Sequence, residues 1–86
     1  MYHLVLSDTF NKEVKKLTKS NKSLKSQIKK TITFLYADIN HPSLRLHKLS
    51  GEAYWSASVN KSIRIILRWE DNKLYLLKIG THEDVY

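Results

Sequence analysis

A few histidine, arginine and tyrosine side chains in the second half of this 86-residue chain could carry chemistry. The candidates are His47, Arg64, His82 and Tyr86, and no two histidines have the i, i+4 spacing of a helical metal site. The chain has no cysteine and only two glycines, so neither a thiolate zinc site nor a glycine-rich phosphate loop is present. We therefore expect no metal and no organic cofactor.

These residue types suit one reaction in particular, the metal-independent cleavage of RNA. In that reaction the substrate's own 2′-hydroxyl attacks the adjacent phosphorus, and the 5′-oxygen leaves. The protein must accept a proton from the 2′-oxygen, donate one to the 5′-oxygen and stabilise the negative charge on the phosphoryl oxygens. Histidine, with an ordinary pKa of ~6.5, can perform either proton transfer, and arginine can bind two phosphate oxygens at once. An aromatic ring can stack on an unpaired base.

Each candidate residue also has a structural interpretation. His47 and His82 could be surface histidines bonded to a neighbour. Arg64 lies between two isoleucines and could belong to an internal ion pair, and Tyr86 could anchor the chain end by packing. Composition alone leaves these alternatives open.

The net charge of +7 comes from a single segment of the chain. Residues 11–30 contain eight lysines and one acid, Glu13, whereas the rest of the chain has seven basic and seven acidic residues. A lysine-rich surface attracts polyanions such as RNA, DNA or an acidic protein. The alternative is a solvated helix face that only keeps the protein in solution. The complete segregation of the charge favours a polyanionic partner.

The apolar residues of the first half predict a strand followed by two helices. Residues 2–6 are typical of a strand, and Ser7 or Asp8 can cap the first helix. After a polar break, a second helix is expected over residues 23–40. It should end there because Pro42 restricts His41, the residue before it, away from helical angles. The apolar positions at helical spacing are Phe10, Val14 and Leu17 in the first helix and Leu24, Ile28, Ile32, Leu35 and Ile39 in the second.

The second half of the chain has the two-residue period of strands. Four strands are expected at residues 43–49, 53–59, 62–69 and 73–79. Turns are expected at Ser50–Gly51 and at residues 70–72, and Gly80 should end the last strand. In the first of these strands, His47 should share a face with Arg45. In the third, Arg64 and Arg68 should lie opposite the core-facing isoleucines.

The order of elements predicts a single two-layer α+β domain over residues 1–86. An N-terminal strand and a helical hairpin should pack on a mostly antiparallel four-stranded sheet. The first residues lack the pattern of a signal peptide, and no stretch approaches the ~18 apolar residues of a membrane span. We therefore expect a cytoplasmic protein without a membrane partner.

Four stretches of the second half, "LHKLSG", "YWSASV", "RIILRW" and "LLKIGTHEDVY", resemble the RelE/ParE superfamily of type II toxin–antitoxin toxins. The H-x-L-x-G segment and the G-T-H-E-D-V-Y ending are most similar to the YafQ and RelE branches. The resemblance implies a fold like that of small microbial ribonucleases, with the active face on the sheet and two helices behind it. It also implies a ribosome-dependent endoribonuclease that cleaves mRNA in the A site and so inhibits translation.

The resemblance also implies roles for individual residues. His47 matches a catalytic histidine of the YafQ branch, Arg64 an arginine that contacts the scissile phosphate, and His82 a general acid or base. Tyr86 matches the final aromatic residue that contacts the substrate. We expect His82 to donate the proton to the 5′-oxygen and His47 to act as the base. Contacts with RNA or the ribosome are expected from Lys48, Arg45, Arg68, Lys12, Lys15, Lys16, Lys19, Lys22, Lys25 and Lys29.

The sequence also departs from the pattern of these branches. The YafQ branch has a further histidine and an aspartate near the positions of Val59 and Ser62, and neither is present here. RelE itself relies on lysines and arginines, and YoeB-like members use a glutamate without a clear equivalent in this chain. The division of the acid and base roles between the two histidines therefore stays open.

The resemblance implies partners and leaves two alternative functions. A cognate antitoxin, acidic and encoded alongside, should bind the toxin in a hetero-oligomeric complex that contacts operator DNA through the antitoxin. The other expected partners are mRNA and ribosomal RNA.

The first alternative is a ParE-like toxin that inhibits DNA gyrase by protein binding, and the pair His47 and His82 favours the ribonuclease over it. The second alternative, an inert nucleic-acid-binding module, would leave these residues without a role.

Overall fold

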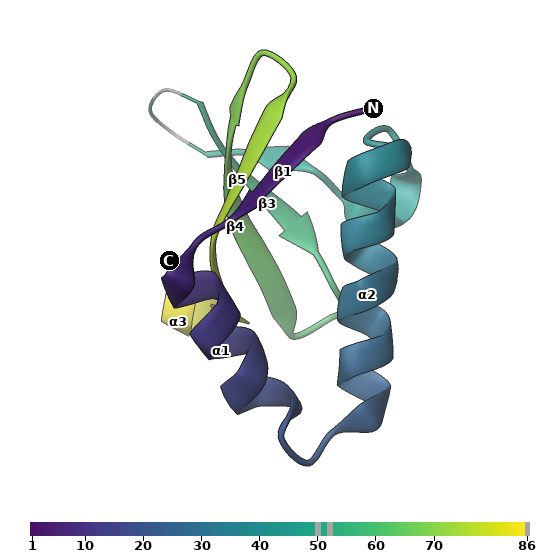
Figure 1. Cartoon of the computed structure of the whole chain (residues 1–86), viewed down its shortest axis with the longest axis vertical. Helices are drawn as coiled ribbons and strands as arrows, with labels where there is room; N and C mark the ends of the chain where they lie inside the picture. Colours follow the sequence, from purple (N-terminus) through teal and green to yellow (C-terminus); the bar gives the residue numbers. More distant parts are fainter. Residues whose placement is uncertain (50, 52, 86) are drawn as a thin grey trace.

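The structure is a computed structural model that describes residues 1–49, 51 and 53–85, including their side chains except that of Asp84. Two helices pack against a five-stranded sheet formed by these residues, which confirms the predicted α+β class (Figure 1). The elements in chain order are β1 (His3–Leu6), α1 (Asp8–Thr18), α2 (Lys22–Ala37), the 3₁₀ helix η1 (Pro42–Leu44), β2 (His47–Lys48), β3 (Tyr54–Ser58), β4 (Ile63–Glu70), β5 (Lys73–Thr81) and α3 (His82–Val85).

The sheet has the strand order β1-β5-β4-β3-β2. The N-terminal strand joins the four later strands at one edge, where β1 pairs parallel with β5, and all other pairs are antiparallel. A two-residue turn at Asp71 and Asn72 joins β4 to β5, with Asp71 in the left-handed region at φ 53°. The register shifts beside Ile66, because Ile66 pairs with Lys78 whereas Leu67 pairs with Leu76.

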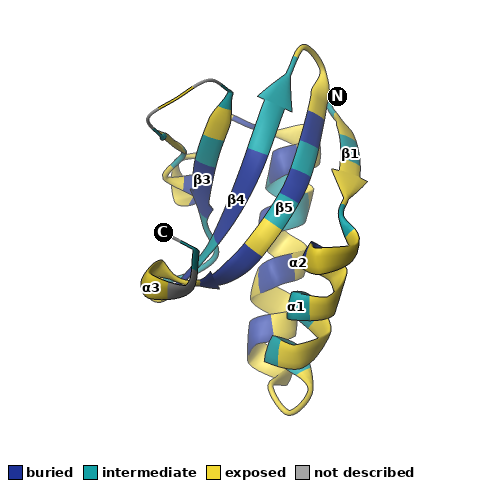
Figure 2. Cartoon of the chain, turned by 90° about the vertical axis from the view of Figure 1, so that its left-hand side faces the viewer, coloured by how far each residue is buried: buried dark blue, intermediate teal, exposed yellow. Residues whose placement is uncertain are grey.

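Both helices begin at side-chain caps. The Ser7 hydroxyl accepts a hydrogen bond from the Phe10 N–H at 3.0 Å, and the Asn21 side chain accepts one from the Leu24 N–H at 3.0 Å. The second helix ends at Ala37, about one turn earlier than predicted. The core lies between the helices and the sheet and contains Phe10, Leu24, Ile28, Leu35, Ile65, Leu67, Leu74, Leu76 and Ile79. Figure 2 shows buried positions along β4 and β5 and exposed positions along the outer sides of both helices.

The predicted strand at residues 43–49 is wrong over most of its length. Residues Pro42–Leu44 form a 3₁₀ turn, Arg45 follows in the left-handed region at φ 41°, and strand pairing is limited to His47–Lys48. The His41 imidazole caps this turn by accepting a hydrogen bond from the Ser43 N–H at 3.1 Å. Leu44 is fully buried although it lies in a turn. The apolar residues Leu44 and Leu46 therefore alternate with polar residues as they would in a strand, and this pattern led to the wrong prediction. Arg45 therefore does not share a strand face with His47.

The end of the last strand also differs from the prediction. Strand β5 continues through Gly80 to Thr81, and Gly80 pairs with Arg64 on β4. The β1 strand pairs with β5 only as far as Leu76, so the later part of β5 lacks this neighbour. There the Glu13 carboxylate accepts a hydrogen bond from the Ile79 N–H at 3.0 Å and replaces the missing strand partner.

Two predicted features involve residues outside the described part of the chain. Ser50 of the predicted Ser50–Gly51 turn is one of these, while Gly51 itself has φ 101°. Tyr86 is the other. No described helix is both long and apolar enough to cross a membrane.

Candidate functional site

The outer face of the sheet, turned away from the helices, carries the predicted arginine. On β4 the core receives Ile63 and Ile65, so Arg64 between them points to the opposite face, where it is half-buried. Its neighbours in register are Ser58 on β3 and Gly80 on β5. Because glycine has no side chain, nothing on β5 stands beside the arginine at this position.

Two hydrogen bonds fix the guanidinium group of Arg64. Its Nε donates to the Ser56 hydroxyl at 2.5 Å, and its Nη2 donates to the Arg45 carbonyl at 3.3 Å. Ser56 is fully buried, and the left-handed backbone of Arg45 is uncommon for a residue with a side chain. A guanidinium has five N–H donors, so donors remain to bind two phosphate oxygens. No carboxylate of the described residues forms an ion pair with Arg64.

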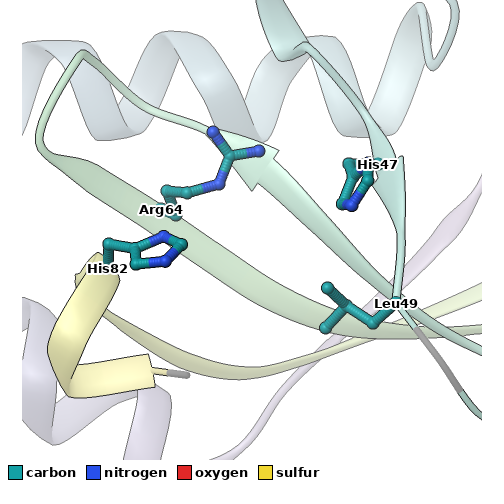
Figure 3. Close-up of a pocket in the computed structure, with 4 residues that line it drawn as sticks. All are labelled: His47, Leu49, Arg64 and His82. Atoms are coloured by element: carbon teal, nitrogen blue, oxygen red, sulfur yellow. The ribbon is translucent and has the colours of Figure 1, made fainter.

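Arg64 and both predicted catalytic histidines line one hollow of about 550 Å³. Figure 3 shows His47 and His82 on opposite sides of this hollow, with Arg64 extending from β4 between them and Leu49 on the remaining side. His47 comes from the short strand β2, and His82 is the first residue of α3. The structure thus brings together three of the four predicted catalytic residues, whereas Tyr86 lies outside the described part of the chain.

The sheet register accounts for these positions. His47 pairs with Ser56 on β3, and Ser56 in turn pairs with Ile66 on β4, so all three residues point to the outer face. On the other side, Thr81 pairs with Ile63, and His82 follows it directly. The short helix α3 lies against the ends of β4 and β5, which places His82 beside the strand that carries Arg64.

Two residues of this site were missed by sequence reasoning. Ser56 positions Arg64, and Leu49 provides the apolar wall of the hollow. A signal for Ser56 was present, because the period of residues 53–59 alternates Tyr54, Ser56 and Ser58 with apolar residues. Nothing in that pattern indicated the arginine as its partner.

The family of this chain follows from a match over nearly its whole length. A family model described as "Bacterial toxin of type II toxin-antitoxin system, YafQ" matches residues 2–86. The chain belongs to this YafQ family. The family lies within the superfamily that the sequence resembles, so the predicted membership is confirmed. No curated protein matches the chain significantly.

Solved structures of toxins share the YafQ-family fold of this chain. A chain of the Escherichia coli DinJ–YafQ complex has a TM-score of 0.85 at 24% identity, covering 100% of this chain and 99% of that one. A copper-bound mutant toxin from Helicobacter pylori has a TM-score of 0.83 at 22% identity, with 100% of both chains covered. A YoeB/ParE toxin from Agrobacterium tumefaciens has a TM-score of 0.76 at 16% identity, covering 95% of this chain and 99% of that one.

The predicted RNA-contacting residues of this YafQ-family chain lie in three places. Arg45 borders Arg64, and the Lys48 ammonium lies 6.0 Å from the centre of the Trp55 ring. Arg68 forms an ion pair with Glu70, so its charge is partly compensated within the protein. The remaining seven are exposed lysines of the two helices and the turn between them: Lys12, Lys15, Lys16, Lys19, Lys22, Lys25 and Lys29.

Metal-ligating side chains do not cluster in the described part of this YafQ-family chain. Among the described residues, no group of three or more histidine, cysteine, aspartate or glutamate side chains is placed to hold a metal ion. His47 and His82 meet at the hollow together with an arginine and a leucine. The side chains lining the hollow thus offer proton transfer and anion binding.

Proposed function

We propose that this YafQ-family toxin is an endoribonuclease that cleaves mRNA in the ribosomal A site and thereby stops translation. The observation that carries the proposal is the hollow in which His47 and His82 flank Arg64. Two histidines on opposite sides of a phosphate can remove one proton and deliver another. A fixed arginine between them can stabilise the charge that develops on the phosphoryl oxygens.

In the proposed reaction, His47 accepts the proton of the 2′-hydroxyl as its oxygen attacks phosphorus. The bond from phosphorus to the 5′-oxygen then breaks, and His82 donates a proton to that oxygen. The products are a 2′,3′-cyclic phosphate and a free 5′-hydroxyl. Arg64 binds the phosphoryl oxygens with the N–H donors that Ser56 and Arg45 leave available. No step of this scheme uses a metal ion.

We propose partners on the same basis. The structural neighbour from Escherichia coli was solved as a toxin–antitoxin complex with DinJ, and we infer an acidic antitoxin encoded next to this chain. The lysine-rich surface of α1 and α2 is proposed to contact ribosomal RNA. Its exposed ammonium groups can bind backbone phosphates electrostatically, without depending on the RNA sequence. The hetero-oligomeric complex would contact operator DNA through the antitoxin.

The test is a cell-free translation reaction followed by primer extension on the message. Wild-type protein should produce cleavage within ribosome-bound codons, and His82→Ala should lower the cleavage rate by ~10²–10⁴-fold. His3→Ala is the matched control, because His3 is an exposed histidine on β1, away from the hollow, and should leave the rate unchanged. Circular dichroism of both variants checks the fold.

Two results would contradict the proposal. Cleavage by His82→Ala at the wild-type rate would remove this histidine from the reaction. Inhibition of gyrase supercoiling by the wild-type protein, with translation unaffected, would favour the ParE-like alternative.

A further inference from the structure

A second hollow, of about 520 Å³, adjoins the first and shares Arg64 with it. It lies toward the turn between β3 and β4 and toward η1. Its cationic lining residues are Arg45, Lys61 and Arg64, and no acidic side chain of the described residues lines it. Arg45 and Lys61 are both exposed. The hollow therefore presents positive charge directly beside the proposed cleavage site.

Two of the three neutral polar side chains of this second hollow, Ser58 and Asn60, are already engaged within the protein, and the third belongs to Ser43. The Ser58 hydroxyl donates to the Asn60 carbonyl at 2.9 Å. The Asn60 side-chain oxygen accepts from the N–H groups of Ser62 and Ile63, both at 2.8 Å, and its nitrogen donates to Gln27 at 2.8 Å. These amide and hydroxyl groups are the kinds that read base edges. With Ser58 and Asn60 engaged, the groups left to bind a ligand are the three cations and the exposed Ser43 hydroxyl, which can itself donate to a phosphate oxygen.

We propose that the second hollow is a phosphate subsite, which binds the RNA backbone one nucleotide away from the scissile bond without reading the base. The inference rests on the proposed function, because it takes the scissile phosphate to lie at Arg64 in the first hollow. Arg45 and Lys61 bind the neighbouring phosphate, so the RNA chain crosses the outer face of the sheet through both hollows. Backbone contacts of this kind position a nucleic acid and add affinity that depends on salt.

Arg45 has two separable roles in this arrangement. Its backbone carbonyl accepts the hydrogen bond that orients Arg64, whereas its side chain lines the second hollow. A substitution at Arg45 removes the side chain and keeps the carbonyl. Loss of the subsite can therefore be separated from loss of the orientation of Arg64.

The experiment measures binding of 2′-O-methyl oligonucleotides, which cannot be cleaved because the 2′-oxygen carries no proton. Fluorescently labelled chains of two, three and four nucleotides, with one, two and three phosphodiesters, are titrated with the protein at several salt concentrations. Wild-type protein should gain about tenfold in affinity when the second phosphodiester is added, as expected for a charge-assisted contact. The double variant Arg45→Gln/Lys61→Gln should lose this gain, and its salt slope should fall by ~0.7 for each phosphate that is no longer neutralised.

Three comparisons make the result specific. Arg45→Lys should retain most of the gain, because the positive charge is kept. Lys73→Gln removes one positive charge at the opposite end of the β4–β5 hairpin, where Lys73 is the register partner of Glu70, and should leave the gain intact. Exchanging uracil for adenine at the added nucleotide should change the affinity by less than about twofold.

The proposal is overturned if wild-type protein gains nothing from the second phosphodiester, or if the double variant keeps the gain. It is also overturned if Lys73→Gln abolishes the gain equally, or if the base exchange has a large effect. The proposed function is judged separately, by cleavage of mRNA on ribosomes. A protein that fails to cleave yet shows the charge-dependent gain keeps the subsite and loses the endoribonuclease assignment.

Discussion

The outer face of the sheet and the outer surface of the helices are both basic, but they hold their charge in different ways. On the sheet, the Arg64 guanidinium is fixed by Ser56 and by the Arg45 carbonyl. On the helices, the lysines of α1 and α2 occupy exposed positions of amphipathic helices (Figure 2). A fixed charge can bind one phosphate in one geometry, whereas mobile charges attract any polyanion. The sheet therefore suits catalysis and the helices suit diffuse contact.

Arg64→Ala should have the largest effect, because it removes the fixed charge from the outer face of the sheet. Cleavage should fall by about 10²–10³-fold, because the donors aimed at the developing phosphoryl charge are removed. The free energy of unfolding should also fall, by about 1–3 kcal/mol, because the buried Ser56 hydroxyl loses its partner. Single-turnover cleavage and thermal unfolding measure the two effects.

The double variant Arg64→Ala/Ser56→Ala separates stability from catalysis. Removing the orphaned hydroxyl should recover much of the lost stability while leaving cleavage as low as in Arg64→Ala. If stability and cleavage recover together, the arginine has only a structural role.

Ser56→Ala tests whether the fixed geometry of the guanidinium matters. The charge of Arg64 stays, but its orientation relaxes, and cleavage should fall by roughly 10- to 100-fold. Ser58→Ala is the matched control, because Ser58 lies on the same strand and its hydroxyl bonds to the Asn60 carbonyl. Equal losses in the two variants would show that Ser56 acts only through the stability of the strand. The decisive readout is kcat, which should change for Ser56→Ala while RNA binding changes little.

Much of this comparison was predictable from the sequence. The period of residues 62–69 placed Arg64 on the outer face, and the segregation of lysines predicted a basic helical pair. Both inferences depend on local periodicity, which burial of one face imposes directly on the sequence. The resemblance to a known superfamily predicted roles for His47 and His82, and the structure places both at the same hollow as Arg64.

The parts that were not predictable depend on contacts between distant segments. Alternating leucines imitated a strand at residues 43–49, where the capped turn at Pro42 and burial of Leu44 determined the structure. Gly80 resembled a strand breaker, yet pairing with Arg64 keeps it within β5. The hydrogen bond from Arg64 to the Arg45 carbonyl links residues 19 positions apart and has no sequence signature.

Glu13, the one acid of the lysine-rich segment, connects the helices to the sheet. Its carboxylate accepts the hydrogen bond of the Ile79 N–H, just before the strand end that leads into His82. Glu13→Ala should lower the free energy of unfolding by about 1–3 kcal/mol, because the backbone donor loses its partner. Glu13→Gln is the matched control, since the amide oxygen can still accept the bond. If Glu13→Gln lowered the melting temperature below that of the wild type by as much as Glu13→Ala does, the charge of Glu13 would matter and the hydrogen bond would not.

Lys25→Gln should have the smallest effect and tests the diffuse half of the comparison. Lys25 is exposed on α2, so the free energy of unfolding should change by no more than about 0.5 kcal/mol. Cleavage on ribosomes should change by less than about threefold, because neighbouring lysines continue to attract the same phosphates. Adding Lys22→Gln and Lys29→Gln should lower ribosome binding stepwise and reduce its salt dependence. If the loss of a single lysine abolished cleavage, that lysine would make a specific contact. The charges of the helical surface would then act as the fixed charge on the sheet does, and not diffusely.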